Sequence, residues 1–169
     1  MNPPIRSSAH VDGLWHWLNQ GVPDVLGSDH APHTLEEKAK TYPASPSGMP
    51  GVQTLLPLML DHVAAGRLTL ARLIDLTSAG PLRVFGLAGK GRIAAGYDAD
   101  FTVVDLKGRM IVTEDWLASR CGWSPFTGMD LAGRVVGTIV RGNRVMWEGS
   151  LANAAVGEPV RFVPTLRAA

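Results

Sequence analysis

The chain has 169 residues, of which 46% are hydrophobic and 18% charged, so it is long enough for one packed domain, or for one domain and a piece of another. Sixteen Lys and Arg residues against fifteen Asp and Glu residues give a net charge of +1. No run of adjacent basic residues would follow a phosphate backbone, and we therefore expect no nucleic-acid partner.

The cysteine content and the longest apolar runs indicate in which compartment the protein is expected and whether it crosses a membrane. The single cysteine, Cys121, excludes a disulfide framework and favours a reducing compartment, so we expect the protein in the cytoplasm. No segment holds the roughly 18 apolar residues needed to cross a bilayer, and residues 1–10 lack the apolar stretch of a signal peptide. The sequence thus predicts a soluble protein with no membrane partner.

The first half of the chain alternates helix and strand. Apolar residues at helical spacing predict a helix over 8–21, with Ser7 or Ser8 available as its N-cap. Residues 22–28 are short and largely apolar, which predicts a buried parallel strand. Residues 34–51 hold three prolines and two glycines and predict a long loop, on which Glu36, Glu37 and Lys38 form a solvated face. Helices are predicted over 53–65 and over 70–77, the second ending near Gly80 and Pro81, with a short third helix over 82–86.

From about residue 89 the pattern changes to strands and turns. The Gly142-Asn143 pair is predicted to close a hairpin between the last two strands. The last twenty residues lack a clear period, and we expect them to wrap over the surface or to be partly disordered. The predicted strands cover 101–106, 110–113, 135–142 and 144–149.

A polar cluster, GSDHAPHT at 27–34, follows the predicted strand. In a parallel α/β architecture the carboxyl ends of the strands point at the ligand site, so this position favours function. Asp29 could bind a divalent metal through one oxygen and take a proton from a metal-bound water with the other. His33 could donate to an anionic substrate, while His30 could be a ligand or could brace the turn.

A second interpretation of this cluster needs no catalysis. An Asp-His pair after a strand is often a helix cap with a satisfied histidine, and spacing alone does not separate the two interpretations. The remaining histidines, His10, His16 and His62, lie in helical or capping contexts and are assigned no role.

Several longer stretches resemble one family. NPPIR (2–6), SDHAPHTLEEK (28–38) and PSGMPGVQTLLPLML (46–60), in this order and spacing, resemble the C-terminal part of the dihydroorotases of the amidohydrolase superfamily. Residues 91–106 and 121–149 resemble that superfamily's return into its β-sandwich and the closing strands. The resemblance implies an α/β fold: the C-terminal part of a TIM-like (β/α)8 barrel at 1–88, followed by strands of a small β-sandwich module and a tail at 89–169.

The resemblance also implies an activity and a set of site residues. The reaction is zinc-dependent, reversible hydrolysis of (S)-dihydroorotate to N-carbamoyl-L-aspartate in de novo pyrimidine biosynthesis. Asp29 matches the aspartate that binds zinc and acts as general base and acid. Asn2 and His33 match substrate-binding positions, and Ser47 and Gly48 fall where the family's loop contacts the substrate through backbone groups.

The sequence also departs from this family. A complete barrel needs about 250 residues, and the family's His-x-His pair, its carboxylated lysine and two further histidine ligands have no match here. We therefore expect a fragment or a misplaced start, with no hydrolase activity of its own. One alternative is a non-catalytic dihydroorotase-like remnant or structural partner of aspartate transcarbamoylase, and another is an allantoinase or hydantoinase. The expected macromolecular partner is a second copy of the chain or aspartate transcarbamoylase. The DHAPH form favours dihydroorotase, because the other two families tend to carry a different residue at the position of His33.

Overall fold

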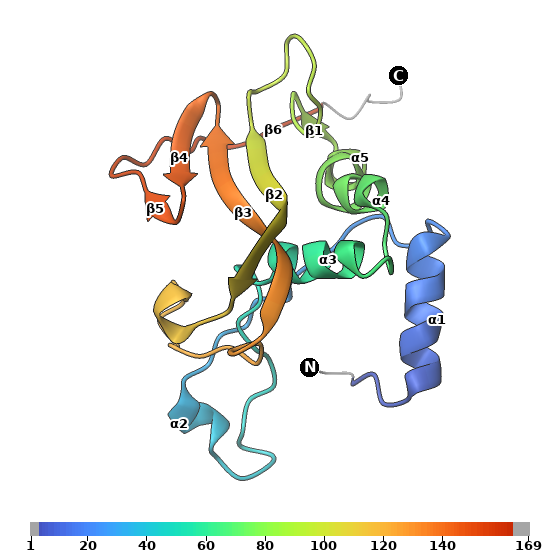
Figure 1. Ribbon diagram of the computed structural model, residues 1–169, viewed down its shortest axis with the longest axis vertical. Coiled ribbons are helices and arrows are strands. Elements are labelled where there is room, and N and C mark those ends of the chain that lie inside the picture. Colours follow the sequence, from blue (N-terminus) through green and yellow to red (C-terminus); the bar gives the residue numbers. More distant parts are fainter. Residues whose placement is uncertain (1–3, 164–169) are drawn as a thin grey trace, which may run out of the picture.

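The computed structural model describes residues 4–163, which form a helical half and a strand-rich half (Figure 1). The helices are α1 (Ser8–Asn19), α2 (Leu35–Lys38), α3 (Leu55–Ala64), α4 (Leu70–Ile74), the π-helical turn η1 (Asp75–Ala79), α5 (Gly80–Phe85) and the 3-10 turn η2 (Glu114–Trp116). The strands are β1 (Leu87–Ala88), β2 (Phe101–Ile111), β3 (Asp130–Val140), β4 (Asn143–Trp147), β5 (Ser150–Leu151) and β6 (Arg161–Phe162). No helix among the described residues is both long and apolar enough to span a bilayer.

The predicted first helix is confirmed as α1. The Ser7 hydroxyl accepts a hydrogen bond from the backbone N–H of His10 at 3.2 Å, which is the N-cap that the sequence offered. Trp15 and Leu18 pack against the core of the protein. None of the residues of α1 is fully buried, and Leu14 remains 51% exposed. The helix is therefore packed against the rest of the protein on one face only.

The prediction of a strand over 22–28 is wrong for the described residues. The hydrogen bonds of this segment's backbone go to helices and not to a strand. The N–H of Val22 donates to the carbonyl of Trp17 at 3.1 Å, and the N–H of Leu26 donates to the carbonyl of Leu76 at 3.2 Å. The carbonyl of Pro23 accepts a hydrogen bond from the Arg72 guanidinium. A strand needs a partner along its length, because each residue presents one donor and one acceptor to it. No described strand runs beside residues 22–28, so their apolar pattern has no ladder to join.

The helices after the loop differ from the prediction in where they end. Gly80 and Pro81 do not end the second helix, since α4 continues through η1 into α5. Pro81 lies in the first turn of α5, where its missing N–H needs no partner. The predicted third helix is therefore α5, which begins two residues before 82. The long loop contains a single helical turn, α2, that the proline and glycine content did not indicate.

The strand-rich half is an antiparallel sheet with the order β2-β3-β4-β5. The two strands predicted at 101–106 and 110–113 are one strand, β2, whose register shifts between Asp105 and Arg109. The Asp105 carboxylate accepts hydrogen bonds from the N–H groups of Lys107 and Gly108, both at 3.0 Å, and so fixes the irregular part of the strand.

Two tight connections complete this half. The hairpin between β3 and β4 pairs Val140 with Asn143, so its turn is Arg141-Gly142, one residue before the predicted pair. Both turn residues have positive φ, 49° and 80°, as the twist of a two-residue hairpin requires. Near the C-terminus, β6 pairs with β1, so the end of the described chain returns to the helical half (Figure 1).

The core lies where α3 crosses β3 (Figure 1). The Asp61 carboxylate of α3 accepts a hydrogen bond from the N–H of Ala132 at 2.9 Å. A Cβ on Gly133, which has φ 84°, would lie 2.9 Å from the Cβ of Leu60, so this close crossing requires glycine. The buried cluster consists of Met59, Leu60, Leu68 and Leu73. The two halves thus share a core at this crossing, and the boundary at 88/89 stays a prediction.

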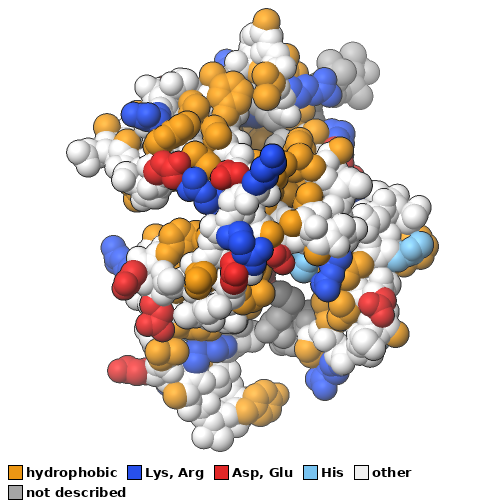
Figure 2. All heavy atoms as spheres, viewed as in Figure 1, with side chains coloured by type: hydrophobic (Ala, Val, Ile, Leu, Met, Phe, Trp, Pro, Cys, Tyr) orange, Lys and Arg blue, Asp and Glu red, His pale blue; other side chains and the backbone are white. Residues whose placement is uncertain are grey.

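The surface is larger than that of a compact monomer. The solvent-accessible area is 11545 Å² for a mass of 18.0 kDa, whereas a self-contained monomer of this mass exposes about 8,000 Å². Apolar side chains are spread over the face shown in Figure 2. Trp17 of α1, for example, is 54% exposed. The fold therefore leaves uncovered a part of the apolar surface that a compact domain buries.

Candidate active site

Asp29 lies on an exposed turn and points its carboxylate at no described partner. Its φ of 45° is in the left-handed region, which aspartate tolerates better than most residues. The helix-cap interpretation does not hold for it, because Thr34 provides the cap of the following helix α2. Among the described residues, no group donates a hydrogen bond to this carboxylate and no cation pairs with it, so it remains available to a ligand.

His30 braces the turn that carries Asp29. Its Nδ1 accepts hydrogen bonds from the backbone N–H groups of Gly51 and Val52, at 3.0 and 3.3 Å. An imidazole that accepts at Nδ1 is neutral and carries its proton on Nε2. His30 also pairs with Met49 in an isolated parallel bridge. Of the two roles that the sequence left open for His30, the geometry supports the bracing role.

His33 is held through both its backbone and its ring. Its carbonyl accepts a 2.7 Å hydrogen bond from the indole N–H of Trp123, and its Nδ1 lies 3.6 Å from Glu37 Oε2. The backbone N–H of Thr34 is the main cause that holds the pKa of the Glu37 carboxyl below its ordinary value of 4.5, and the charge of protonated His33 adds to it. The ring, with its side chain 30% exposed, remains accessible.

Glu37 and Lys38 are more than a solvated face of the loop, contrary to the prediction. Glu37 and Thr34 form a reciprocal capping box, with N···O distances of 2.9 and 3.2 Å. The Lys38 ammonium donates to the carbonyls of Pro46, at 2.8 Å, and Gly48, at 3.1 Å. The sequence contains the capping-box signal, Thr-x-x-Glu, whereas nothing local indicates the contacts of Lys38 or of Trp123.

Ser47 and Gly48 lie on the loop that runs beside the turn of Asp29. Gly48 has φ 109°, and a Cβ there would lie 2.7 Å from the Cβ of Ala31. The backbone N–H of Ala31 donates to the carbonyl of Met49 at 3.0 Å, and Ser47 is exposed. The structure therefore brings the turn of Asp29 and the loop of Ser47 together. The remaining predicted substrate contact, Asn2, lies outside the described residues.

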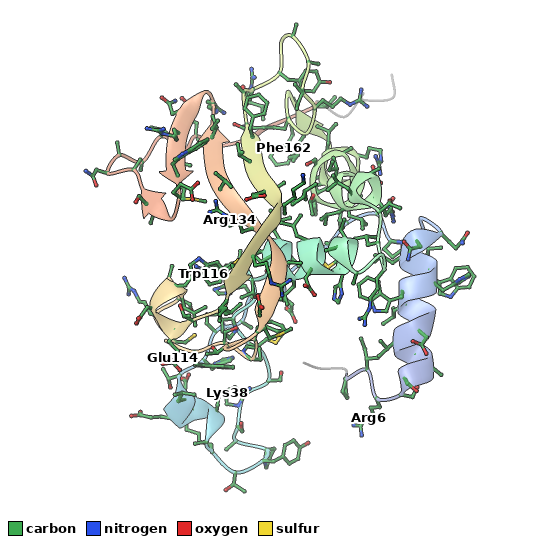
Figure 3. All side chains as sticks on the ribbon, in the orientation of Figure 1. Arg6, Lys38, Glu114, Trp116, Arg134 and Phe162 are labelled. Atoms are coloured by element: carbon green, nitrogen blue, oxygen red, sulfur yellow. The ribbon has the colours of Figure 1, made fainter. Side chains whose placement is uncertain are left out.

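A cavity of about 270 Å³ lies behind His30. Gln53 holds its wall in place, since its side-chain amide donates to the carbonyl of Trp116 at 2.6 Å and accepts from the N–H of Ala118 at 2.8 Å. Trp116, labelled in Figure 3, belongs to the turn η2 that faces the start of α3. The lining residues are His30, Pro50, Gly51, Val52, Gln53, Thr54, Leu117, Ala118, Ser119 and Ser124. Asp29 is not among them, so the cavity is separate from the exposed carboxylate.

The described residues do not fit a complete metal site. No group of three or more His, Cys, Asp and Glu side chains in residues 4–163 is arranged to hold a metal ion. A catalytic zinc takes three protein ligands. Asp29 can supply one oxygen, but His30 uses its Nδ1 for backbone N–H groups. The described part of the chain therefore offers the Asp29 carboxylate as a donor but no complete site.

Comparison with known proteins identifies the class. The mixed helices and strands match part of the TIM-barrel-type hydrolases of the hydantoinase group. L-Hydantoinase (dihydropyrimidinase) from Arthrobacter aurescens superposes with a TM-score of 0.85 at 37% identity, over 90% of this chain and 35% of that one. D-Hydantoinase from a Thermus species gives 0.81 at 31% identity, over 90% and 34%.

The family follows from the sequence itself. The model of the amidohydrolase family matches residues 5–145, and the chain belongs to this family. A protein named dihydroorotase from Methanosarcina mazei is 45% identical over 159 residues, and one from Halobacterium salinarum is 45% identical over 161 residues. These matches cover 93% and 95% of this chain but 34% and 38% of the relatives. The chain thus spans about a third of the length of these relatives.

Proposed function

We propose that this chain is the part of a dihydroorotase that carries the general base and acid, Asp29. The whole enzyme would hydrolyse (S)-dihydroorotate reversibly to N-carbamoyl-L-aspartate. The observation that carries this proposal is the exposed carboxylate of Asp29, which no residue in 4–163 binds, on a turn that His30 braces. The identity of 45% to proteins named dihydroorotase supports the choice of substrate.

Each proposed role follows from what the side chain can donate or accept. The Asp29 carboxylate takes a proton from the attacking water and returns it to the ring nitrogen that leaves. His33, whose ring is accessible beside Glu37, donates to the substrate. The backbone groups of Ser47 and Gly48 contact the substrate from the neighbouring loop. Asn2 retains its proposed substrate contact by resemblance alone.

Zinc is proposed as the metal of the whole enzyme because the resemblance implies it. Asp29 would be one ligand, and the others would come from outside residues 4–163, which hold no complete set. A cytoplasmic location, a homo-oligomer and an association with aspartate transcarbamoylase remain predictions.

A hydantoinase is the second candidate, and one observation favours it. The solved structures that superpose on this chain include hydantoinases at 31% and 37% identity. The relatives named dihydroorotase reach 45% identity over a similar share of the chain. Because the latter likeness is closer, dihydroorotate is the preferred substrate. An exposed Asp29 carboxylate without a partner in the described part of the chain supports an enzyme over a structural remnant, since a remnant has no physical need of it.

A chimera tests the proposal. The matching third of the Methanosarcina mazei dihydroorotase would be replaced by this chain, and hydrolysis of dihydroorotate and of hydantoin would be measured side by side. We expect turnover of dihydroorotate, lost in the chimera that also carries Asp29→Asn. A folded chimera that turns over hydantoin alone would support the second candidate, and one that turns over neither substrate would support the remnant.

A further inference from the structure

One lysine links the two loops around the candidate active site. The ammonium of Lys38 donates to the carbonyls of Pro46 and Gly48, at 2.8 and 3.1 Å. It therefore binds the backbone on both sides of Ser47. No carboxylate lies within ion-pair distance of this ammonium among the described residues. Lys38 is half-buried at the end of α2 and is labelled in Figure 3. Its charge therefore acts mainly on these two carbonyls.

Lys38 is itself fixed in place. The capping box of Thr34 and Glu37 satisfies the start of α2, which is only one turn long. The Ser45 hydroxyl donates to the backbone carbonyl of Lys38 at 3.0 Å, so the far side of the loop is tied to the same residue. The position of the ammonium is thus set by hydrogen bonds at both ends of the helical turn.

The loop is held from its other side by the turn of Asp29. A Cβ on Gly48 would lie 2.7 Å from the Cβ and 2.9 Å from the carbonyl oxygen of Ala31, so the two backbones are in direct contact. The N–H of Ala31 donates to the carbonyl of Met49 at 3.0 Å. With Ala31 on one side and Lys38 on the other, the peptide groups around Ser47 have a defined orientation.

This orientation determines which backbone groups face a ligand. In a trans peptide the N–H points opposite to the C=O, so turning the Pro46 carbonyl toward Lys38 turns the N–H of Ser47 away from it. No described residue accepts a hydrogen bond from the N–H of Ser47 or of Gly48. A cation behind the peptide polarises it and strengthens the outward donor. The loop thus presents a directed donor to an oxygen atom.

We propose that Lys38 is a positioning residue that orients the Ser47 and Gly48 backbone for the oxygen atoms of a cyclic amide or of its ring-opened carbamoyl acid. This inference rests on the proposed function, because it takes the loop of Ser47 as a substrate contact. Lys38 does not touch the substrate, and it acts through the carbonyls of Pro46 and Gly48. This positioning role also explains why the Lys38 ammonium lies beside the loop although no described carboxylate pairs with it.

The test uses the full chain, labelled with nitrogen-15, and N-carbamoyl-L-aspartate as the probe. In the wild type we expect rigid backbone order parameters of about 0.85 at Ser47 and Gly48, falling below about 0.6 in Lys38→Met. The apparent dissociation constant of the probe, read from the shifts of the same two amides, should rise about tenfold, as expected for losing hydrogen bonds to a charged group. Lys38→Arg, which keeps the charge and the donors, should recover most of both effects.

Lys40→Met is the matched control, since Lys40 is an exposed lysine two residues away whose ammonium contacts no described group. It should change neither the order parameters nor the affinity. If Lys38→Met leaves the two amides ordered, or loosens them without changing a measured affinity, the inference is wrong. A wild-type chain that binds no probe at saturating concentration, with the same two amides ordered, would instead contradict the substrate contact in the proposed function, and the positioning role with it.

Discussion

The indole N–H of Trp123 donates a 2.7 Å hydrogen bond to the backbone carbonyl of His33, ninety positions earlier in the sequence. This bond joins the segment before β3 to the candidate active site. It holds the backbone of His33, while the ring stays free to meet a ligand. The strand-rich half therefore takes part in shaping the site.

Trp123→Phe should lower the free energy of unfolding by at least about 1 kcal/mol, because the variant keeps only a smaller aromatic ring and leaves the His33 carbonyl without its donor. Urea denaturation followed by circular dichroism measures this change. Trp17→Phe is the control, since Trp17 is 54% exposed, and it should shift the stability by less than about 0.5 kcal/mol. Equal effects of the two substitutions would show that the bond to His33 contributes nothing.

The capping box of α2 should make the stability depend on pH. The pKa of Glu37 is lowered from 4.5, mainly by the backbone N–H of Thr34. A lowered pKa in the folded state gives stability that is fully present above 4.5 and is lost as the pH falls through the folded-state value.

Glu37→Gln tests this dependence while keeping a side chain that can cap. The difference in unfolding free energy between wild type and variant should be largest above pH 4.5 and should shrink toward pH 3, with thermal denaturation at matched ionic strength as the measurement. Glu36→Gln, at an exposed neighbour outside the capping box, is the control. A difference that stays constant with pH, or grows as the pH falls, would contradict the assignment.

Two glycines should respond in opposite directions to the same substitution. Gly48→Ala places a Cβ 2.7 Å from that of Ala31, at a φ of 109°, and should cost about 1–3 kcal/mol of stability. Gly13→Ala, in α1 with no atom within 4 Å of the new Cβ, should add about 0.5–1 kcal/mol through helix propensity. Chemical denaturation of both variants checks the pair. A neutral Gly48→Ala would mean that the loop can move away from Ala31.

Lys90 lies between two acidic side chains that would otherwise repel each other. Its ammonium is 2.9 Å from the Asp98 carboxylate and also pairs with Asp100, and its side chain is only 15% exposed. Lys90→Met should destabilise the fold, because it leaves the two carboxylates close together with Arg141 as their remaining cationic neighbour. Lys107→Met, at an exposed lysine without a side-chain partner among the described residues, should be nearly neutral in the same urea titration. The hypothesis fails if the two variants are equally stable.

The chain alone should not hydrolyse dihydroorotate when zinc is added, since residues 4–163 hold no complete set of metal ligands. An assay of dihydroorotate consumption, with and without zinc, measures this. Asp29→Asn should leave the stability within about 0.5 kcal/mol of wild type, because the carboxylate has no described partner and asparagine also tolerates positive φ. Turnover that depends on zinc and disappears in Asp29→Asn would show that the chain is complete enough to act.

Local signals in the sequence predicted the local features of the fold. The apolar period and the serine cap of α1 lie within a dozen residues, and α3 was predicted in the same way. The strand at 22–28 was predicted wrongly because strand formation depends on a neighbour, and none is present among the described residues. The bulge at Asp105 was missed, since an irregular stretch inside one strand looks like the turn between two.

In the candidate site, too, local signals in the sequence indicated some residues, whereas the roles of others depend on distant contacts. Asp29 and His33 could be selected because they follow one another in a short polar cluster, and the position of that cluster suggested function. The roles of Lys38 and Trp123 depend on contacts across 8 to 90 positions, which no pattern in the sequence specifies. The resemblance to a known family pointed to Ser47 and Gly48, but it gave no reason for their placement.

The close crossing of Gly133 and Leu60 bears on how the protein can be divided. A cut at 88/89 would place α3 and β3 on separate polypeptides, which would expose Leu60 to water and leave the Ala132 N–H without the Asp61 carboxylate. We therefore expect that neither product would be an autonomous folding unit. On this expectation, the change from helices to strands along the chain would be a change of secondary structure within one cooperative unit.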